Sequence, residues 1–118
     1  MSTDYIKPFT EKFKLYVFKN RKRVKLTVMI KEDFGITYLW DQDQFEDMVM
    51  TWEDEWTGKA LGADVFVGPK NKDHPKKKFV RVSIMSQYGT EHRFSYDDMN
   101  SLRDEYINQR DNKMPWDK

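Results

Sequence analysis

Apolar and polar residues alternate in the first part of the chain, after a lead-in of residues 1–10. Segments 13–18 and 24–31 carry apolar side chains at every second position, which is the period of a β-strand with one buried face. The polar run 19–23 between them predicts a hairpin loop, and residues 36–40 predict a short third strand. We therefore expect a strand meander at the start of the fold.

The period then changes to that of a helix. Apolar side chains recur at spacings of three, four and seven residues, namely at Phe45, Met48, Val49, Trp52 and Trp56. Asp41 is the expected N-cap, with Gln44 as its capping-box partner. Thr57 and Gly58 fit the end of this helix.

The second half of the chain predicts the same order of elements. We expect a strand, a long basic loop, a strand, a turn and a strand over residues 63–67, 68–78, 79–87, 88–90 and 91–94. Ser95 is expected to cap a helix that runs to about residue 110, with Met99, Leu102 and Tyr106 facing inward. Residues 111–118 form a tail, from which Met114 and Trp116 are candidates for packing back.

The two halves also share their polar positions. The recurring segments are Val24–Met29 with Val80–Met85, and Trp40–Phe45 with Phe94–Met99. Internal repetition outranks local propensity when a fold is argued from sequence. We predict an α+β fold of two tandem β-β-β(-β)-α repeats, over about residues 12–57 and 62–110, forming one pseudo-symmetric domain of 118 residues. Its antiparallel sheets would carry the helices on one side.

Composition narrows the class of protein. The chain has no cysteine, which excludes a disulfide, a thiolate metal site and a cysteine nucleophile. Aromatic residues make up 15%, which favours a packed core over disorder. Neither a signal-like apolar start nor a long uncharged apolar run is present, so we expect no membrane association. The expected location is cytoplasmic, at the nucleoid or in the nucleus if the protein binds nucleic acid.

The net charge of +1 hides a strong segregation of charge along the chain. Segment 12–31 is rich in Lys and Arg and has no acidic residue, and segment 70–81 is also mostly basic. Segment 41–55 is acidic and has no basic residue. Charge that alternates by structural element predicts a particle with two different faces.

The polar face of the predicted sheets carries the candidate binding residues. If the helices cover one face, the other meets solvent, and aromatic rings or methionines there need a reason. Bases that stack on rings, with Lys and Arg neutralising phosphates, supply one, and the two basic loops would extend that surface. The candidate nucleic-acid-binding residues are Tyr16, Phe18, Lys19, Arg21, Lys22, Arg23, Lys25, Met29, Lys70, Lys72, Lys76, Lys77, Lys78, Arg81 and Met85.

Plainer interpretations of these residues stay open. Basic hairpin loops are often solvated turns, and lysines at a sheet edge block aggregation. Tyr16 and Phe18 also fit a position under the N-terminal Tyr5, Ile6 and Phe9. The outward methionines suit a protein interface, since methionine adapts to irregular partners.

Two stretches of the chain resemble a known superfamily. Residues 12–26 form an alternating strand that runs into a basic, asparagine-containing turn, and residues 94–102 form a strand-to-helix junction. Both resemble parts of the PUR-repeat and Whirly-type single-stranded nucleic-acid-binding proteins, whose relatives include the positive-coactivator family. The resemblance spans about residues 12–110 and implies sheet surfaces that grip single-stranded DNA or RNA. The residues that it carries over are Tyr16, Phe18, Arg21, Lys22, Arg23, Lys25, Lys76, Lys77, Lys78 and Arg81.

The chain departs from that superfamily in two respects. We expect three strands in each unit where the family usually shows four, and glycine-arginine signals are sparse. Both differences also fit convergence on a simple topology.

The sequence gives little support for catalysis. His74 and His92 have no carboxylate cluster with metal-ligand spacing beside them. The paired acids near Asp41 and Asp97 are explained by helix starts, no phosphate-cradling glycine motif occurs, and no serine has an evident base partner. We therefore expect a protein that is not an enzyme and that uses no cofactor and no metal.

The expected function is weakly sequence-specific binding of single-stranded DNA or RNA, as in transcription regulation. The alternative is a small regulator or inhibitor of the phage-encoded kind, which contacts a host protein through the acidic helix face. That face comprises Asp43, Glu46, Asp47, Glu53 and Asp54. A homodimer through Trp56, Met114 and Trp116 is a third hypothesis.

Overall fold

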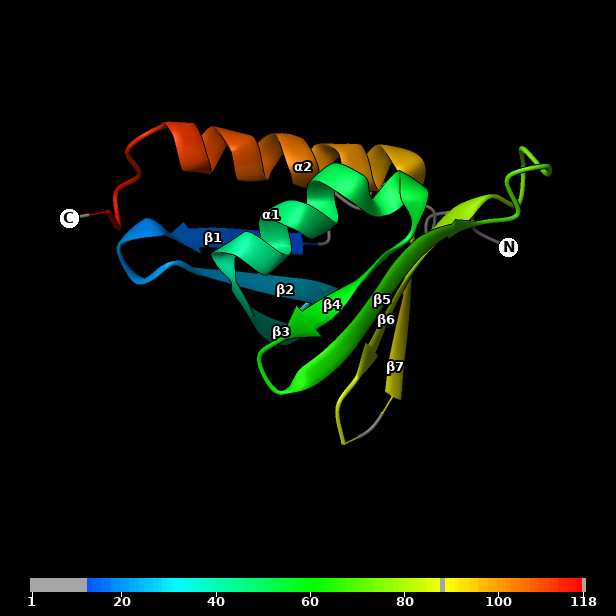
Figure 1. The fold of residues 1–118 in the computed structure, drawn as a ribbon, viewed down its shortest axis with the longest axis horizontal. Coiled ribbons are helices and arrows are strands. Elements are labelled where there is room, and N and C mark those ends of the chain that lie inside the picture. The colour runs from blue at the N-terminus through cyan, green and yellow to red at the C-terminus, as the bar shows by residue number, and fades with distance from the viewer. Residues whose placement is uncertain (1–12, 88, 118) are drawn as a thin grey trace.

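The computed structural model describes residues 13–87 and 89–117 and shows an α+β fold with two antiparallel sheets (Figure 1). The expected lead-in over residues 1–10 lies outside the described residues, as do Lys12 and Tyr88. The contacts proposed for Tyr5, Ile6 and Phe9 lie outside them as well.

The first sheet is the expected meander, in the order β1-β2-β3. It consists of β1 (Phe13–Phe18), β2 (Arg23–Lys31) and β3 (Phe34–Asp41), with the 3-10 turn η3 (Lys19–Arg21) in the first hairpin. The third strand begins at Phe34 rather than at residue 36, because Phe34 pairs with Lys31 beyond a register shift in β2.

The second sheet has four strands, in the order β4-β5-β6-β7. They are β4 (Trp56–Ala60), β5 (Ala63–Lys70), β6 (Phe79–Met85) and β7 (Gly89–Phe94). Strand β4 corrects the prediction that a helix extends to Thr57 and Gly58. The helix α1 (Gln42–Thr51) ends earlier and is followed by the 3-10 turn η4 (Trp52–Asp54). Trp56 is a buried residue of a strand, and its four-residue spacing from Trp52 is one that a helix would also give.

The second helix is capped as predicted and the first is not. At the start of α2 (Tyr96–Asp111), the Asp98 N–H donates to Ser95 Oγ at 2.9 Å and the Ser95 N–H donates to Asp98 Oδ2 at 3.1 Å. Asp41 makes no side-chain cap, because its carboxylate pairs with Arg23 on the neighbouring strand. Gln44 Oε1 instead accepts a hydrogen bond from the Lys59 N–H at 2.9 Å, on β4.

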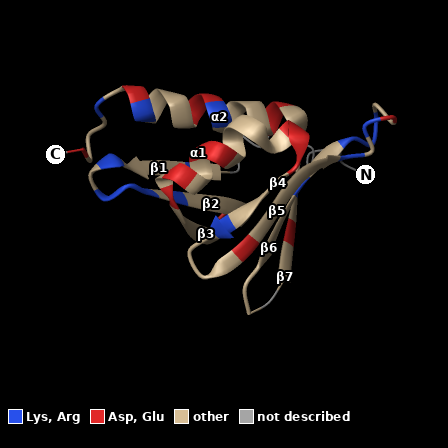
Figure 2. Cartoon of the chain, in the orientation of Figure 1, with Lys and Arg blue, Asp and Glu red and all other residues tan. Residues whose placement is uncertain are grey.

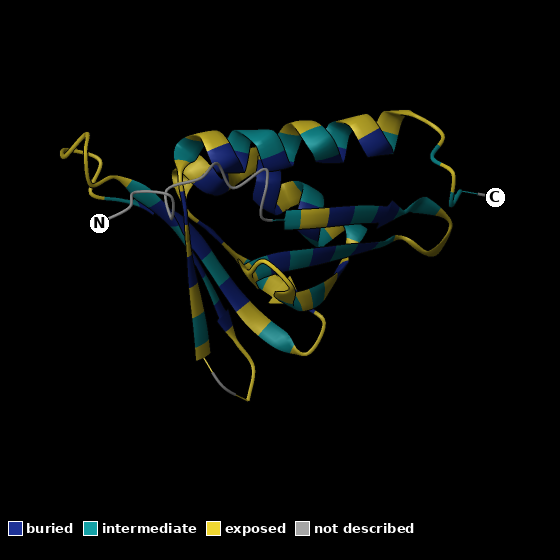
Figure 3. Cartoon of the chain, turned by 180° about the vertical axis from the view of Figure 1, so that it is seen from behind, coloured by how far each residue is buried: buried dark blue, intermediate teal, exposed yellow. Residues whose placement is uncertain are grey.

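Both helices pack together on one side of the sheets, and the buried side chains of all these elements form one hydrophobic cluster (Figure 1). The inward positions predicted on the middle strands are all buried, namely Val24, Leu26, Val28, Val80, Val82 and Ile84. Figure 3 shows how buried positions alternate with more exposed ones along the strands. None of the described helices has the length and apolar character to cross a membrane.

The offset of 54 residues that relates Trp40–Phe45 to Phe94–Met99 also relates Tyr38 to His92 and Trp52 to Tyr106, and several corresponding positions contact one another. Tyr38 on β3 and His92 on β7 are such a pair, and their side chains are hydrogen-bonded at 2.8 Å. Gln42 Nε2 donates to Tyr106 Oη at 3.3 Å, and the corresponding Tyr96 and Trp52 rings meet with centroids 5.3 Å apart. Such reciprocal contacts are what two units facing each other across a two-fold axis would make. The duplication itself stays a prediction.

The outer edge of β1 is covered by α2. Gln109 is 3% exposed, and its side-chain amide bonds to the backbone of β1 as a strand would. The Val17 N–H donates to Gln109 Oε1 at 2.8 Å, and Gln109 Nε2 donates to the Leu15 carbonyl at 2.7 Å. Gln109, which lies near the C-terminus, therefore supplies hydrogen bonds to β1 that a neighbouring strand would otherwise supply.

Replacing Gln109 by Leu should destabilise the fold. Leucine keeps most of the volume but leaves the Val17 N–H and the Leu15 carbonyl buried without these partners, so we expect urea unfolding to show a loss of about 1–3 kcal/mol. The exposed Asp104 lies on the same helix, and Asp104→Ala should stay within about 0.5 kcal/mol of the wild type. Equal effects of the two substitutions would contradict this role for Gln109.

His92 should make the stability depend on pH. Burial lowers the pKa of His92 and raises the pKa of Tyr38, its hydrogen-bond partner. Because the folded state disfavours the charged imidazole, the stability is fully present above the unfolded pKa of about 6.5 and falls as the pH drops below it. We expect urea unfolding at a series of pH values to show this decline in the wild type and in His74→Gln, which alters an exposed histidine. His92→Gln should show a weaker decline, and an unchanged decline would contradict the assignment.

Candidate nucleic-acid interface

The outer face of the first sheet, which lies opposite the helices, brings together part of the predicted site. Tyr16 pairs across the strands with Lys25, and Phe18 pairs with Arg23. Lys25 Nζ lies 5.4 Å from the centroid of the Tyr16 ring, and the Phe18 and Tyr16 rings are stacked with centroids 6.3 Å apart. Met29 lies further along the same face, half-buried and opposite Gly35. The face thus combines rings with cations, as predicted.

The β1–β2 hairpin holds two exposed cations at the end of this face. Lys22 closes the turn with a left-handed backbone, φ 53°, and its N–H donates to the Lys19 carbonyl at 3.2 Å. The Lys22 carbonyl in turn accepts from the Gln42 N–H at 2.9 Å, which ties the hairpin to the start of α1. Among the described residues, no carboxylate pairs with Arg21 or Lys22. Both side chains are exposed.

Two other predicted cations of this region are engaged within the protein. Lys19 Nζ lies 3.2 Å from Asp117 Oδ2 and donates to the carbonyls of Arg110 and Asn112. Arg23 forms an ion pair with Asp41. Lys19 therefore fixes the C-terminal segment as well as adding positive charge, whereas Arg23 is paired at the surface.

The C-terminal segment packs back against β1, as predicted for Trp116. The Trp116 Nε1–H donates to the Val17 carbonyl at 2.9 Å, and the indole meets the Tyr16 ring edge-on with centroids 5.0 Å apart. A hydrogen bond from the Met114 N–H, together with the Lys19 ammonium, lowers the pKa of Asp117. Sequence reasoning did not include Trp116 in the binding face, because a tail has no period that shows where its side chains lie.

The outer face of the second sheet carries Arg81 and Met85 from the predicted set. It also carries Phe66, Phe79 and Arg93, which the sequence analysis did not include. The Arg81 guanidinium lies 5.6 Å from the Phe66 ring centroid, and that of Arg93 lies 5.0 Å from the Phe79 ring centroid. Both cations also lie close to Glu91, at 3.9 Å from Arg81 and 3.2 Å from Arg93. Strand alternation was the available signal, since Phe66 stands between buried Val65 and Val67. An arginine guanidinium therefore already lies over each of these two rings.

The second basic loop lies far from the first. Residues 71–78 are exposed and carry Lys72, Lys76, Lys77 and Lys78, and Lys70 ends β5 beside them. In Figure 2 this loop and the β1–β2 hairpin lie at opposite ends of the long axis of a molecule that measures 46 Å along it. The expectation that both loops extend one surface is therefore not met: the structure does not bring them together.

The acidic helix face predicted for a protein partner is partly used inside the fold. Glu46 Oε1 accepts from Tyr106 Oη at 2.8 Å and pairs with Arg110 at 3.3 Å, and Asp47 Oδ2 accepts from the Trp56 indole at 2.8 Å. Burial, with Glu46 as a further cause, raises the pKa of Tyr106 to about 12. The remaining acids of this face, namely Asp43, Glu53 and Asp54, are exposed.

Two further expectations concern a dimer interface at Trp56 and a metal site. Trp56 was a candidate for a dimer interface, but its side chain is only 5% exposed and belongs to the core. Among the described residues, no group of three or more His, Asp or Glu side chains is placed to hold a metal ion. His92 instead contacts Tyr38, and His74 lies in the exposed basic loop.

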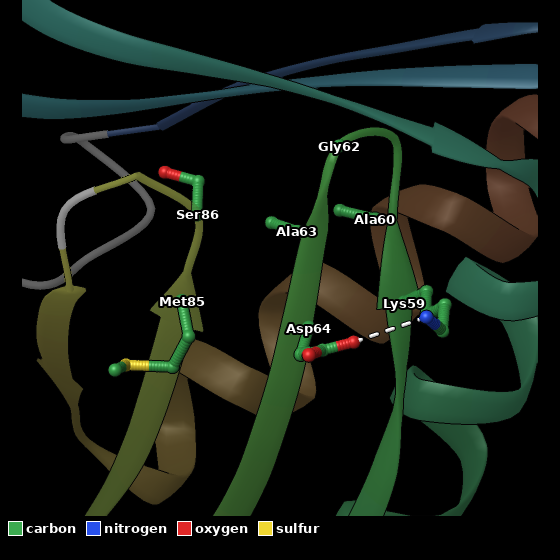
Figure 4. Close-up of a pocket in the computed structure, with 7 residues that line it drawn as sticks. All are labelled: Lys59, Ala60, Gly62, Ala63, Asp64, Met85 and Ser86. Atoms are coloured by element: carbon green, nitrogen blue, oxygen red, sulfur yellow. Dashed lines mark ion pairs between the residues drawn. The ribbon is translucent and has the colours of Figure 1, made fainter.

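A hollow lies at the end of the second sheet that is opposite the basic loop, and its lining offers few groups that could bind a ligand. It measures about 340 Å³ and lies between the β4–β5 turn and the end of β6 (Figure 4). Figure 4 shows the Lys59–Asp64 ion pair at one side, with atoms 3.2 Å apart, and Met85 at the other. Small residues and one ion pair offer no ring on which a base could stack.

The chain has no match among protein-family models, curated proteins or solved structures. Its function must therefore be argued from its own geometry. The outer face of the first sheet brings together aromatic rings, the exposed hairpin cations and Trp116, so it offers more groups for binding than the other surfaces described above.

Proposed function

We propose that this protein binds single-stranded nucleic acid through the outer face of the first sheet, with little sequence preference. The observation that carries the proposal is the cross-strand set of Tyr16, Phe18 and Lys25, which ends at the exposed Arg21 and Lys22. Rings on a solvent-facing sheet stack with unpaired bases, and every base offers a flat face. Cations beside them neutralise phosphates without reading sequence.

The order of elements adds support to this proposal. Between α1 and α2 lie four strands, β4 to β7, and four is the number that the resemblance to PUR-repeat, Whirly-type and positive-coactivator proteins implies for one unit. The competing hypothesis of a protein regulator that uses the acidic helix face is less well supported. Two of the five carboxylates of that face already bind Tyr106, Arg110 and Trp56.

The test is a charge reversal in the hairpin, Arg21→Glu with Lys22→Glu. Both side chains are exposed, so the fold should remain intact. We expect fluorescence anisotropy with a labelled strand of about eight nucleotides to show roughly tenfold or more loss of affinity at low salt. The slope of log affinity against log salt should become shallower by about 0.7 for each phosphate that the variant no longer neutralises.

A matched control reverses two charges at the other end of the molecule, Lys76→Glu with Lys77→Glu. Because the two loops lie at opposite ends, a short strand on the first sheet should bind this variant almost as well as the wild type. Unchanged binding by the hairpin variant, or no binding by the wild type, would reject the proposal. A DNA strand, an RNA strand and a duplex compared in parallel would decide which nucleic acid is preferred.

A further inference from the structure

A pocket lies where the β1–β2 hairpin meets the C-terminal segment. It measures about 310 Å³ and is lined by Phe18, Asn20, Arg21, Trp116 and Asp117, and we refer to it as the Trp116 pocket. This volume is at the lower end of the range typical of small-molecule sites, which begins at about 300 Å³. The pocket adjoins the outer face of the first sheet through Phe18.

The walls of the Trp116 pocket are held in place by internal contacts. The indole N–H of Trp116 donates to the Val17 carbonyl at 2.9 Å, and Asp117 pairs with Lys19 at 3.2 Å. Asp117 Oδ2 also accepts from the Met114 N–H at 2.9 Å. A site whose walls are fixed before binding loses little conformational entropy when a ligand enters.

The lining separates into three kinds of chemistry. Phe18 and Trp116 supply aromatic surface, and the exposed Arg21 supplies a guanidinium that suits a phosphate. The Asp117 side chain is 10% exposed, and its lowered pKa keeps it ionised at neutral pH, so it accepts hydrogen bonds and repels anions. Aromatic surface, a hydrogen-bond acceptor and a cation suit the flat face of a base, an N–H donor on its edge and the phosphate of one nucleotide.

Three other hollows among the described residues lack this combination. The hollow near Lys59 and Met85 contains no ring. The one between Pro69 and Tyr96 has a single ring, and Lys78 Nζ lies over it at 5.1 Å from the centroid. The hollow along Asp43 and Asp47 is acidic and has no ring, which disfavours a nucleotide.

We propose that the Trp116 pocket holds one base of the bound strand and prefers bases with an exocyclic amino group. A carboxylate accepts a hydrogen bond from the amino group of cytosine, and adenine and guanine carry equivalent donors. Thymine and uracil present carbonyl oxygens on either side of their one N–H, and a carboxylate repels these oxygens. The inference rests on the proposed function and adds one position of base preference to otherwise unspecific binding.

The first test uses single nucleotides and does not depend on strand binding. The indole N–H resonance of Trp116, assigned by its loss in Trp116→Phe, is followed while each of the four deoxynucleoside monophosphates is added. We expect the resonance to shift with the adenine, cytosine and guanine nucleotides and to shift least with the thymine nucleotide. Asp117→Asn, which offers a donor as well as an acceptor, should reduce that difference.

The second test uses the labelled strand and a ring exchange. Phe18→Leu should weaken binding roughly five- to 150-fold, the range for the loss of one stacked base, and Phe18→Tyr should restore it. Phe34 is a matched control, because it is 55% exposed and lies on the β2–β3 hairpin outside the pocket. Phe34→Leu should bind as the wild type does.

The outcomes separate the pocket from the proposed function. If the strand binds but Phe18→Leu binds it equally well, Phe18 stacks no base and the pocket is not a base subsite. The proposed function would then depend on Tyr16, Lys25 and the hairpin cations alone. If the wild type fails to bind any strand, the proposed function falls, and the indole titration alone decides about the pocket. An indole resonance that none of the nucleotides shifts would overturn the pocket.

Discussion

One-sided burial is the constraint on which the rest of this structure depends. Inward side chains of both sheets meet those of both helices in a single cluster, and this cluster includes Trp40, Trp52 and Tyr106. A sheet that buries only one face must offer the other to solvent. The strand alternation that builds the core therefore also decides that Tyr16, Phe18 and Lys25 share the opposite face. Core and candidate interface are two results of the same pattern.

The second constraint is the outer edge of β1. An exposed edge strand offers unpaired backbone groups to any other strand, and proteins usually cover such an edge. Here Gln109 and Trp116 bond to the backbone at Leu15 and Val17. Covering the edge brings the C-terminal segment beside the hairpin, and this creates the Trp116 pocket. The pocket thus results from the contacts that cover the outer edge of β1.

Much of this fold follows from periodicity, and what does not follow has definite physical causes. The predicted strands and the Ser95 N-cap depend on local patterns, so they could be predicted. Strand β4 could not, because Trp56 is buried at a spacing that a helix would also give. The ring–cation pairs of the second sheet depend on strand register, and the position of Trp116 depends on tertiary contacts. Strand alternation indicates that Phe66 faces outward, but it does not show which cation lies over which ring, and the sequence contains no local signal for the position of Trp116.

Positive charge alone does not identify the cations that would meet a phosphate, since their existing partners decide how freely they can move. Arg23 and Asp41 are both well exposed, at 43% and 51%, and exposed ion pairs contribute only about 0–1 kcal/mol. A phosphate could therefore recruit Arg23 at little cost. Lys19 is different, because its partner Asp117 is 10% exposed and also fixes the C-terminal segment. Releasing Lys19 would remove one of the contacts that hold Asp117 in the wall of the Trp116 pocket, so the interaction that engages this cation also helps to fix the site.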